Sequence, residues 1–177
     1  MRTSVTWFAR ALVACLMMAA LSTTLAGCGF QLRGSNGAYN LPFKSIWLSF
    51  NEASPLGTEL KRNLRAGDTV RIETDAKKAE ALFDVVNEAR GKAILSLNSL
   101  GRVREYSLSY TLVFQVRDAT GRQLLAPTEI TLRRNIAFDE SQVLAKESEE
   151  ALLYRDMQSD LVQQIIRRLA AIKPEGA

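Results

Sequence analysis

Arg104-Glu-Tyr-Ser-Leu-Ser-Tyr-Thr-Leu-Val-Phe-Gln-Val-Arg117 alternates apolar and polar residues along almost its whole length. Successive side chains of a β-strand point to opposite faces, so this pattern predicts a strand with one buried and one solvated face. The predicted strand extends over Gly101–Arg117. The apolar face is formed by Tyr106, Leu108, Tyr110, Leu112, Phe114 and Val116. A strand of this kind is typical of an antiparallel sheet packed on helices.

Two less regular strands flank this segment, at Leu82–Asn98 and Gln123–Phe138. Asp118-Ala119-Thr120-Gly121 has the composition of the turn that joins the central strand to the later one. Gly91 predicts a bend or bulge in the earlier strand. Pro127 predicts that the later strand lies at a sheet edge or contains a bulge. The three strands together predict an antiparallel meander.

The residues before the meander predict a strand, a helix and a second short strand. Lys44–Phe50 and Thr69–Thr74 are the strands. Ser54 is a suitable N-cap and Pro55 a suitable first helical residue, and Ala66-Gly67 ends the helix. The apolar stripe of this helix repeats every four residues, at Leu56, Leu60 and Leu64.

A second, longer helix follows the meander and ends near Ile172. Either Ser141 or Ser148 is expected to cap it. Apolar residues keep helical spacing at Tyr154, Met157, Leu161, Ile165, Leu169 and Ile172. The predicted fold class is therefore α+β, with two helices packed on one face of a mixed, mostly antiparallel sheet of four or five strands.

The N-terminal residues have the organisation of an export signal. Met1–Arg10 is basic, Ala11–Ala26 contains no charge, and Leu25-Ala26-Gly27-Cys28 follows. This ending is similar to a bacterial lipobox, in which cleavage occurs between Gly27 and Cys28 and the cysteine receives lipid. The alternative is a short membrane anchor with an ordinary cysteine, but its 16 uncharged residues are fewer than the roughly 20 that a spanning helix needs.

The expected organisation is a signal peptide at 1–27, a lipidated tether at 28–40, one domain at 41–173 and a tail at 174–177. Gly29 follows Cys28 at a position where inner-membrane retention signals usually have aspartate. The outer membrane is therefore the expected location, with the domain on the periplasmic side.

Composition excludes several functions. The chain has no histidine, which removes the common catalytic triads and most zinc sites. Without residues 1–27 the chain has 150 residues, a net charge of +2 and a single cysteine. These values argue against metal clusters, internal disulfides and nucleic-acid binding. A Ser-Lys hydrolase remains an alternative, but no serine among Ser96, Ser99 and Ser107 stands out. We therefore predict a non-enzymatic protein without cofactor or metal.

Four arginines on the predicted strands are the candidate ligand-binding residues: Arg102, Arg104, Arg133 and Arg134. Arg104 and Arg134 interrupt otherwise apolar faces. Guanidinium groups beside aliphatic side chains suit a ligand that has both phosphate groups and acyl chains. The alternative is that the arginines pair with Glu105 and Glu129 or extend into solvent.

The opposite face of the central strand is polar and uncharged, with Ser107, Ser109, Thr111 and Gln115. A face of this kind suits plain solvent. It equally suits the polar lumen of a β-barrel.

Four motifs, in order along the chain, resemble the LptE family of lipopolysaccharide-assembly lipoproteins. They are Cys-Gly-Phe-x-Leu-Arg-Gly at 28–34, the Pro-Leu…Leu…Leu helix at 55–64, Arg-x-Arg-Glu-Tyr at 102–106, and Phe-Asp…Leu-Ala-Lys at 138–146. The resemblance covers essentially the whole chain after Gly27.

The resemblance implies two helices against a four-stranded sheet and a lipoprotein that sits inside the outer-membrane β-barrel LptD. It further implies that the protein helps this barrel assemble, plugs its lumen and binds lipopolysaccharide. In the family, basic residues on the middle strands bind this ligand, and the nearest matches here are the four arginines named above. The alternative is a periplasmic accessory lipoprotein of another envelope transport or barrel-assembly system.

Overall fold

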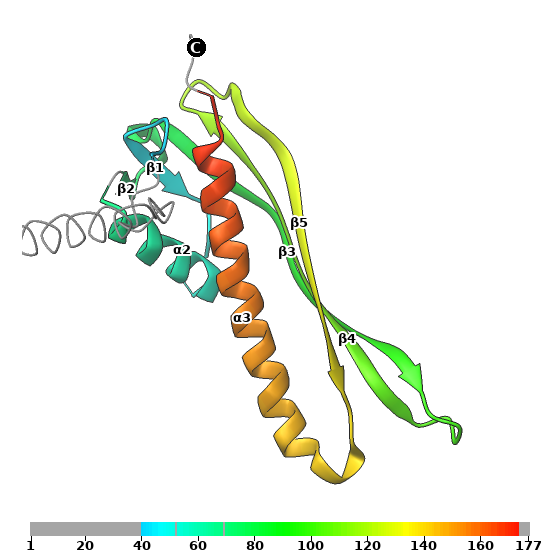
Figure 1. The fold of residues 1–177 in the computed structure, drawn as a ribbon. Helices are drawn as coiled ribbons and strands as arrows, with labels where there is room; N and C mark the ends of the chain where they lie inside the picture. Colours follow the sequence, from blue (N-terminus) through cyan, green and yellow to red (C-terminus); the bar gives the residue numbers. More distant parts are fainter. Residues whose placement is uncertain (1–39, 52, 69, 174–177) are drawn as a thin grey trace, which may run out of the picture. The chain divides into compact units, whose positions relative to one another are not determined.

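The computed structural model describes residues 40–51, 53–68 and 70–173, so the predicted signal peptide, Cys28 and nearly all of the tether lie outside the described residues. The fold is α+β, as expected, and the sheet has five strands (Figure 1). In chain order the elements are β1 (Ser45–Leu48), α2 (Pro55–Ala66), β2 (Arg71–Glu73), the 3-10 turn η1 (Ala76–Lys78), β3 (Ala81–Leu97), β4 (Val103–Asp118), β5 (Gln123–Ala137), the 3-10 turn η2 (Glu140–Gln142) and α3 (Val143–Ala170).

The strand order is β2-β1-β3-β4-β5. β1 pairs in parallel with β2 and with β3, over only three residues on each side. β3, β4 and β5 form the predicted antiparallel meander. The sheet is therefore mixed, and most of its length is antiparallel.

The meander has the predicted turn and the predicted edge. The Gly121 N–H donates to the Asp118 carbonyl at 3.0 Å, and Gly121 has a φ of +89°. β5 is an edge strand, and its register shifts between Thr128 and Leu125, next to Pro127. The prediction for Gly91 was wrong, because it pairs regularly with Ser109 and the register shifts of β3 lie elsewhere. Val86 and Leu95 are the β3 residues without a register partner at these shifts, so no glycine is needed there.

β4 buries the predicted face. Leu108, Tyr110, Leu112, Phe114 and Val116 have no exposed surface, whereas the alternate residues are half-buried. Tyr106, at the start of the same face, is only half-buried. Burial therefore begins at Leu108, and the preceding part of β4 extends beyond the core.

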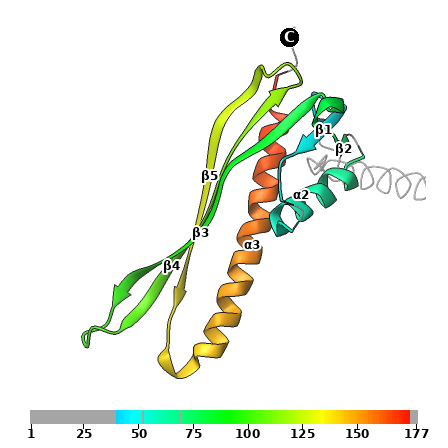
Figure 2. The same ribbon diagram turned by 180° about the vertical axis from the view of Figure 1, so that it is seen from behind.

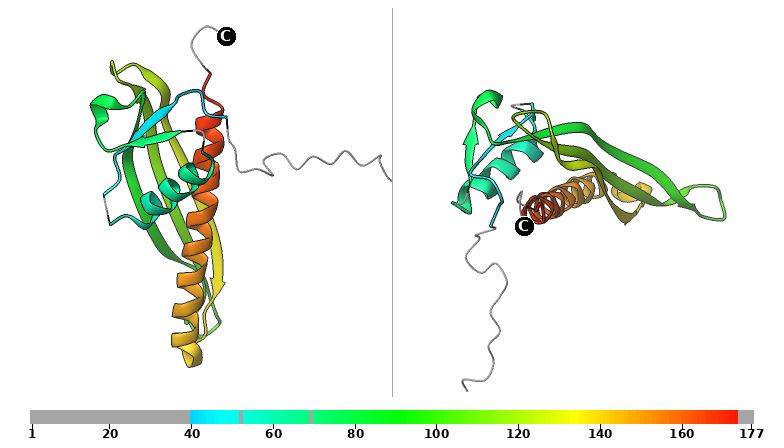
Figure 3. Two further views of the ribbon diagram at one scale, coloured as in Figure 1. Left: turned by 90° about the vertical axis from the view of Figure 1, so that its left-hand side faces the viewer. Right: turned by 90° about the horizontal axis from the view of Figure 1, so that it is seen from above.

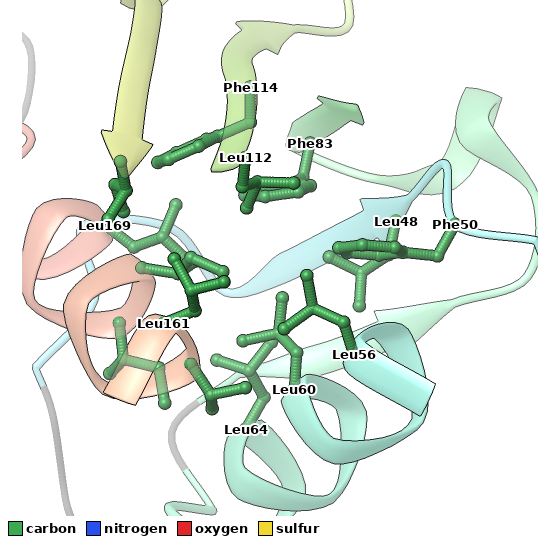
Figure 4. Packing of buried hydrophobic residues seen from close by; sticks show 14 of the residues in the cluster. Leu48, Phe50, Leu56, Leu60, Leu64, Phe83, Leu112, Phe114, Leu161 and Leu169 are labelled. Carbon is green, nitrogen blue, oxygen red and sulfur yellow. The ribbon is translucent and has the colours of Figure 1, made fainter. Parts of the chain in front are cut away.

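α2 begins and ends as predicted. The Gly57 N–H donates to the Ser54 side chain at 3.1 Å, Pro55 is the first helical residue, and the C-cap is Gly67. Leu56, Leu60 and Leu64 point toward Leu48 and Phe50 (Figure 4).

The predicted cap of the long helix was wrong. α3 starts at Val143 after Gln142, which makes no side-chain capping bond. Asp139 instead caps η2, and both the N–H and the hydroxyl of Ser141 donate to its carboxylate. Ser148 lies inside the helix and donates to the Leu144 carbonyl. Asp139, two residues before Ser141, is therefore the cap of the 3-10 turn η2 that precedes α3.

Both helices cover the same face of the sheet (Figure 3). The last half of α3 is buried there through Met157, Leu161, Ile165 and Leu169, as the helical spacing predicted. Phe83 stacks between Phe50 and Phe114, with ring centroids 5.5 and 4.8 Å apart. No helix among the described residues is long and apolar enough to cross a membrane.

Candidate functional site

The end of the β3–β4 hairpin extends away from β1, β2 and α2 (Figures 1 and 2). We call residues 89–107 the distal hairpin. Its exposed large aliphatic side chains are Ile94, Leu95, Leu97 and Leu100, and Leu100 is 78% exposed. They extend past the point at which burial of β4 begins, so no part of the described chain covers them.

The distal hairpin is also cationic. Ala89–Arg104 contains no aspartate or glutamate and carries Arg90, Lys92, Arg102 and Arg104. The distal hairpin therefore combines four positive charges with four exposed aliphatic side chains.

Asn98 orders the loop at the tip. Its side-chain oxygen accepts from the N–H groups of Leu100 and Arg102 at 2.9 and 3.0 Å. Gly101, with a φ of +76°, donates its N–H to the Asn98 carbonyl. This loop geometry holds Leu100 outward.

Arg90 lies between two aromatic rings on the helix-covered face. Its guanidinium carbon is 4.6 Å from the ring centroid of Tyr110 and 5.3 Å from that of Tyr154. It also donates to the Tyr110 hydroxyl and to the Gln158 side-chain oxygen, at 3.3 and 3.2 Å. Burial, followed by the hydrogen bond to Glu88, raises the pKa of Tyr110 to about 12. The phenol therefore stays a neutral donor that keeps Glu88 beside Arg90.

Lys92 connects the hairpin to α3. Its ammonium group lies 2.6 Å from a carboxylate oxygen of Glu150 and 4.4 Å from the ring centroid of Tyr106. The hydrogen bond to Glu150 raises the pKa of Lys92. The Tyr154 hydroxyl donates to the Gly91 carbonyl at 2.7 Å, so α3 holds this part of β3 at two points.

A cavity of about 230 Å³ lies between the start of α3 and the meander. It is lined by Lys92, Tyr106, Ile136, Phe138, Val143, Lys146, Glu147 and Glu150. The two lysines and two glutamates balance in charge. The cavity is therefore neutral overall, and its lining is half charged and half apolar or aromatic.

The four predicted arginines lie in two different parts of the structure. Arg102 and Arg104 belong to the distal hairpin, and the Arg102 guanidinium pairs with Glu140 of η2 at 3.1 Å. Arg133 and Arg134 lie nearer the core, opposite Ser109 and Leu108 of β4, and so on opposite faces of the sheet.

Arg134 reaches α3 and pairs with Asp160 at 2.7 Å. Within the part of the chain that the structure describes, the guanidinium groups of Arg104 and Arg133 have no ion-pair partner. Neither Arg102 nor Arg134 makes the predicted kind of pair with Glu105 or Glu129.

Sequence reasoning missed Arg90 and Lys92. Both have even numbers in β3 and face α3, since they pair with Tyr110 and Leu108. The signal that was available is the long acid-free stretch Ala89–Arg104. Gly91 obscured it, because a bulge there would have placed Arg90 and Lys92 on opposite faces.

The polar face of the meander consists of small, closely packed side chains. Thr111 and Thr131 share a hydrogen bond of 2.9 Å between their hydroxyls. A Cβ at Gly91 would lie 2.6 Å from the Ser109 hydroxyl oxygen, so a side chain there would require the Ser109 hydroxyl to move. On this face, β3 carries Ala89, Gly91 and Ala93 around this point, which gives a surface of small side chains.

Comparison with known proteins agrees on one family. The family model "LptE: Lipopolysaccharide-assembly" matches residues 43–169. The LPS-assembly lipoprotein LptE of Pectobacterium atrosepticum is 28% identical over 151 residues, which cover 83% of this chain and 79% of that protein.

Two solved structures have the same fold. An uncharacterized lipoprotein B from Nitrosomonas europaea matches with a TM-score of 0.69 and 38% identity, over 81% of this chain and 91% of that one. The rare lipoprotein B from Shewanella oneidensis matches with a TM-score of 0.64 and 27% identity, over 72% and 95% respectively.

Proposed function

Because the chain belongs to the LptE lipopolysaccharide-assembly family, we propose that it is an outer-membrane lipoprotein that binds lipopolysaccharide through its distal hairpin while it plugs the β-barrel LptD. The observation that carries the ligand part is the composition of Ala89–Arg104, with four cations, no acid and four exposed aliphatic side chains. Lipopolysaccharide presents phosphates next to acyl chains. The cationic side chains suit the phosphates, and the exposed aliphatic side chains suit the acyl chains.

Arg102 and Arg104 are the proposed phosphate ligands. Planar guanidinium groups bind phosphate oxygens through paired hydrogen bonds, which ammonium groups do not provide. Arg104 has no ion pair to break within the described chain, and Arg102 exchanges an exposed pair with Glu140 for the ligand. Arg133 and Arg134 extend the same positive potential along β5.

Leu97 and Leu100 are the proposed acyl-chain contacts at the tip. Each methylene that leaves water contributes about 0.8 kcal/mol, so a few of them add usefully to the phosphate contacts. The loop bonds of Asn98 fix the backbone at Leu100 and Arg102 before the ligand arrives. Binding then needs little ordering of the hairpin.

The polar face of the meander is the proposed contact with the barrel wall. The lumen of a large β-barrel is lined with polar side chains. The small side chains around Gly91 and Ser109 let such a wall approach closely. On this view the helix-covered face holds the fold together, and the opposite face meets the partner.

Cys28 is the proposed anchor, with cleavage after Gly27. Several acyl chains on one cysteine hold a protein stably on a bilayer, at about 0.8 kcal/mol for each buried methylene. The protein would then work without turnover of a substrate, as a binding and assembly component.

The test compares Arg102→Glu/Arg104→Glu with a control that makes the same charge change in η1, Lys77→Glu/Lys78→Glu. We expect binding to immobilised lipopolysaccharide to fall at least about tenfold in the first variant, because contacts to charged groups contribute about 1.5–3 kcal/mol each. The control should bind like the parent. A third variant, Arg133→Glu/Arg134→Glu, measures the contribution of β5.

The same variants are then purified in mild detergent from the outer membrane of their own organism. We expect all of them to recover one large β-barrel in stoichiometric amount. Parental lipopolysaccharide binding by the Arg102/Arg104 variant would remove these arginines from the site. Recovery of a different partner would favour the accessory-lipoprotein alternative.

A further inference from the structure

A second cationic surface lies at the end of the domain where the described chain begins. A cavity of about 640 Å³ is lined there by Lys44, Arg65 and Arg71, together with Asp68, Val70 and Ile72. Three basic side chains thus meet one acidic side chain around the same shallow hollow. The distal hairpin lies at the far end of the sheet (Figure 1).

Three elements bring these cations together. Lys44 immediately precedes β1, and its carbonyl accepts from the Arg71 N–H of β2 at 2.9 Å. Arg65 lies in the last turn of α2, which Gly67 then caps. The parallel pairing of β1 and β2 and the end of their connecting helix therefore place the three side chains around one opening.

Carboxylates lie beside these cations, since Asp68 lines the cavity and Glu80 accepts from the Lys44 N–H at 2.7 Å, but few of them pair with the cationic groups themselves. Within the described part of the chain, the side chains of Lys44 and Arg65 have no ion-pair partner. Arg71 lies 3.2 Å from Glu73, but 76% of its side chain stays exposed. All three cations can therefore reach a ligand outside the protein.

The position of the cavity in the chain suggests what that ligand is. Lys44 follows Cys28 by only 16 residues, which span roughly 55 Å at full extension. If Cys28 carries lipid, as proposed above, this end of the domain is the one tethered near the bilayer. Basic residues near an anionic bilayer surface each contribute about fivefold in affinity.

We propose that Lys44, Arg65 and Arg71 form a headgroup site for anionic phospholipids of the membrane that holds Cys28. The phosphates of such lipids are matched by three cations, and the uncharged surface of Val70 and Ile72 lies between them. The lipid on Cys28 supplies attachment, and the headgroup site supplies orientation. A domain held at two points has a fixed orientation relative to the membrane.

The test uses the chain from residue 28 onward with Cys28→Ser, so that no attached lipid contributes. The whole buried core lies between Leu41 and Ile172 and is retained in this chain. Binding is measured by co-sedimentation with vesicles of pure phosphatidylcholine and with vesicles that also contain phosphatidylglycerol. We expect binding to the second kind only, and loss of that binding at high salt.

The decisive variant is Lys44→Gln/Arg65→Gln/Arg71→Gln, compared with Arg155→Gln/Arg167→Gln/Arg168→Gln on α3, whose arginines belong to neither proposed site. Both remove three exposed positive charges, so their net charge is the same. Removal of three cations from the site should weaken binding about 100-fold. The control variant should bind phosphatidylglycerol vesicles like the parent, and circular dichroism checks that both are folded.

Asp68→Asn provides the opposite change. It removes the acid of the cavity while asparagine tolerates the left-handed backbone at this position, where φ is 49°. Binding should become about fivefold tighter.

Three results would overturn the headgroup site. They are equal binding to both kinds of vesicle, parental binding by the Lys44/Arg65/Arg71 variant, and loss of binding in the control variant alone, which would assign phospholipid contact to α3. The proposed lipopolysaccharide contact is measured with other residues, so the two proposals can fail separately.

Discussion

Gly57 is a residue whose role depends on one neighbour. It lies inside α2, where glycine is about 1 kcal/mol worse than alanine as a helix former. A Cβ at this position would lie 2.6 Å from the Phe50 Cβ and 2.7 Å from its Cγ. The glycine therefore lets α2 approach the segment that follows β1.

We predict that Gly57→Ala lowers the free energy of unfolding by about 1–2 kcal/mol, because overpacking costs more than helix propensity gains. Chemical denaturation measures this change. Gly91→Ala is the matched control, since its new Cβ meets only the Ser109 hydroxyl, which can rotate away. A Gly57→Ala variant more stable than the parent would show that Phe50 moves without cost.

Residue patterns predicted both ends of α2, but they did not predict the backbone conformation at its C-terminal end. Ser54 and Pro55 cap the helix as expected, because both act through local geometry. The expected glycine follows the helix, but it does not have a left-handed backbone. Gly67 keeps a right-handed backbone, with φ of −76°, and the left-handed residue is Asp68. Aspartate tolerates that conformation, so composition alone did not identify it.

Among the elements, the turn between β4 and β5 is organised by one carboxylate. Asp118 accepts from the Thr120 hydroxyl at 2.6 Å, from the Thr120 and Arg122 N–H groups, and from the Arg122 guanidinium. These bonds, led by that of the Thr120 hydroxyl, lower the pKa of Asp118 from 3.8 to about 2. The ionised form is therefore the one that the folded turn stabilises.

A lowered folded-state pKa means that this stabilisation is complete above the unfolded value of 3.8 and is lost as the pH falls toward 2. We predict that the stability difference between the parent and Asp118→Asn shrinks over this interval. Denaturation curves at a series of pH values measure it. A difference that stays constant down to pH 2 would mean that the carboxylate charge does not matter to the turn.

Long elements were predictable and short ones were only partly so. The alternation of apolar and polar residues along the meander predicted its strands, and the predicted bounds were close to those observed. The sheet order β2-β1-β3 was not predicted, because three-residue parallel pairings leave no periodic signal. The cap of α3 was predicted wrongly because no side chain caps this helix, and Asp139 caps the 3-10 turn η2 that precedes it.

For the candidate site, the alternation of residues along the strand predicted that Arg104 lies on the helix-covered face. The positions of Arg133 and Arg134 depend on the register between β4 and β5. Arg133 and Arg134 face opposite sides of the sheet, and their distance from the hairpin tip depends on their pairing with Ser109 and Leu108. Side chains of α3 that touch the hairpin, such as Glu150, lie far away in sequence. Nothing local in either segment indicates that contact.

At the scale of the whole molecule, one buried glutamine joins three elements. The Gln158 amide of α3 donates to Glu59 of α2 at 2.7 Å, and its oxygen accepts from Arg90 of β3 at 3.2 Å. It is one of two buried polar side chains among the described residues. The helices and the distal hairpin are therefore held in one network.

We predict that Gln158→Leu lowers the free energy of unfolding by about 1–3 kcal/mol, because Glu59 and Arg90 each lose a partner in a partly buried place. Gln164→Leu is the control on the same helix, and it should change stability by less than about 0.5 kcal/mol. Thermal denaturation compares the two. Equal stability of both variants would mean that water replaces the amide at no cost.

The position of β1 between β2 and β3 also has a consequence for the order of events during synthesis. β1, α2 and β2 leave the ribosome first, yet β1 has no partner on its second side until Ala81–Leu97 has been made. The three-residue pairing with β2 is too short to hold by itself. β1 can therefore be paired on both of its sides only after the middle third of the chain has emerged.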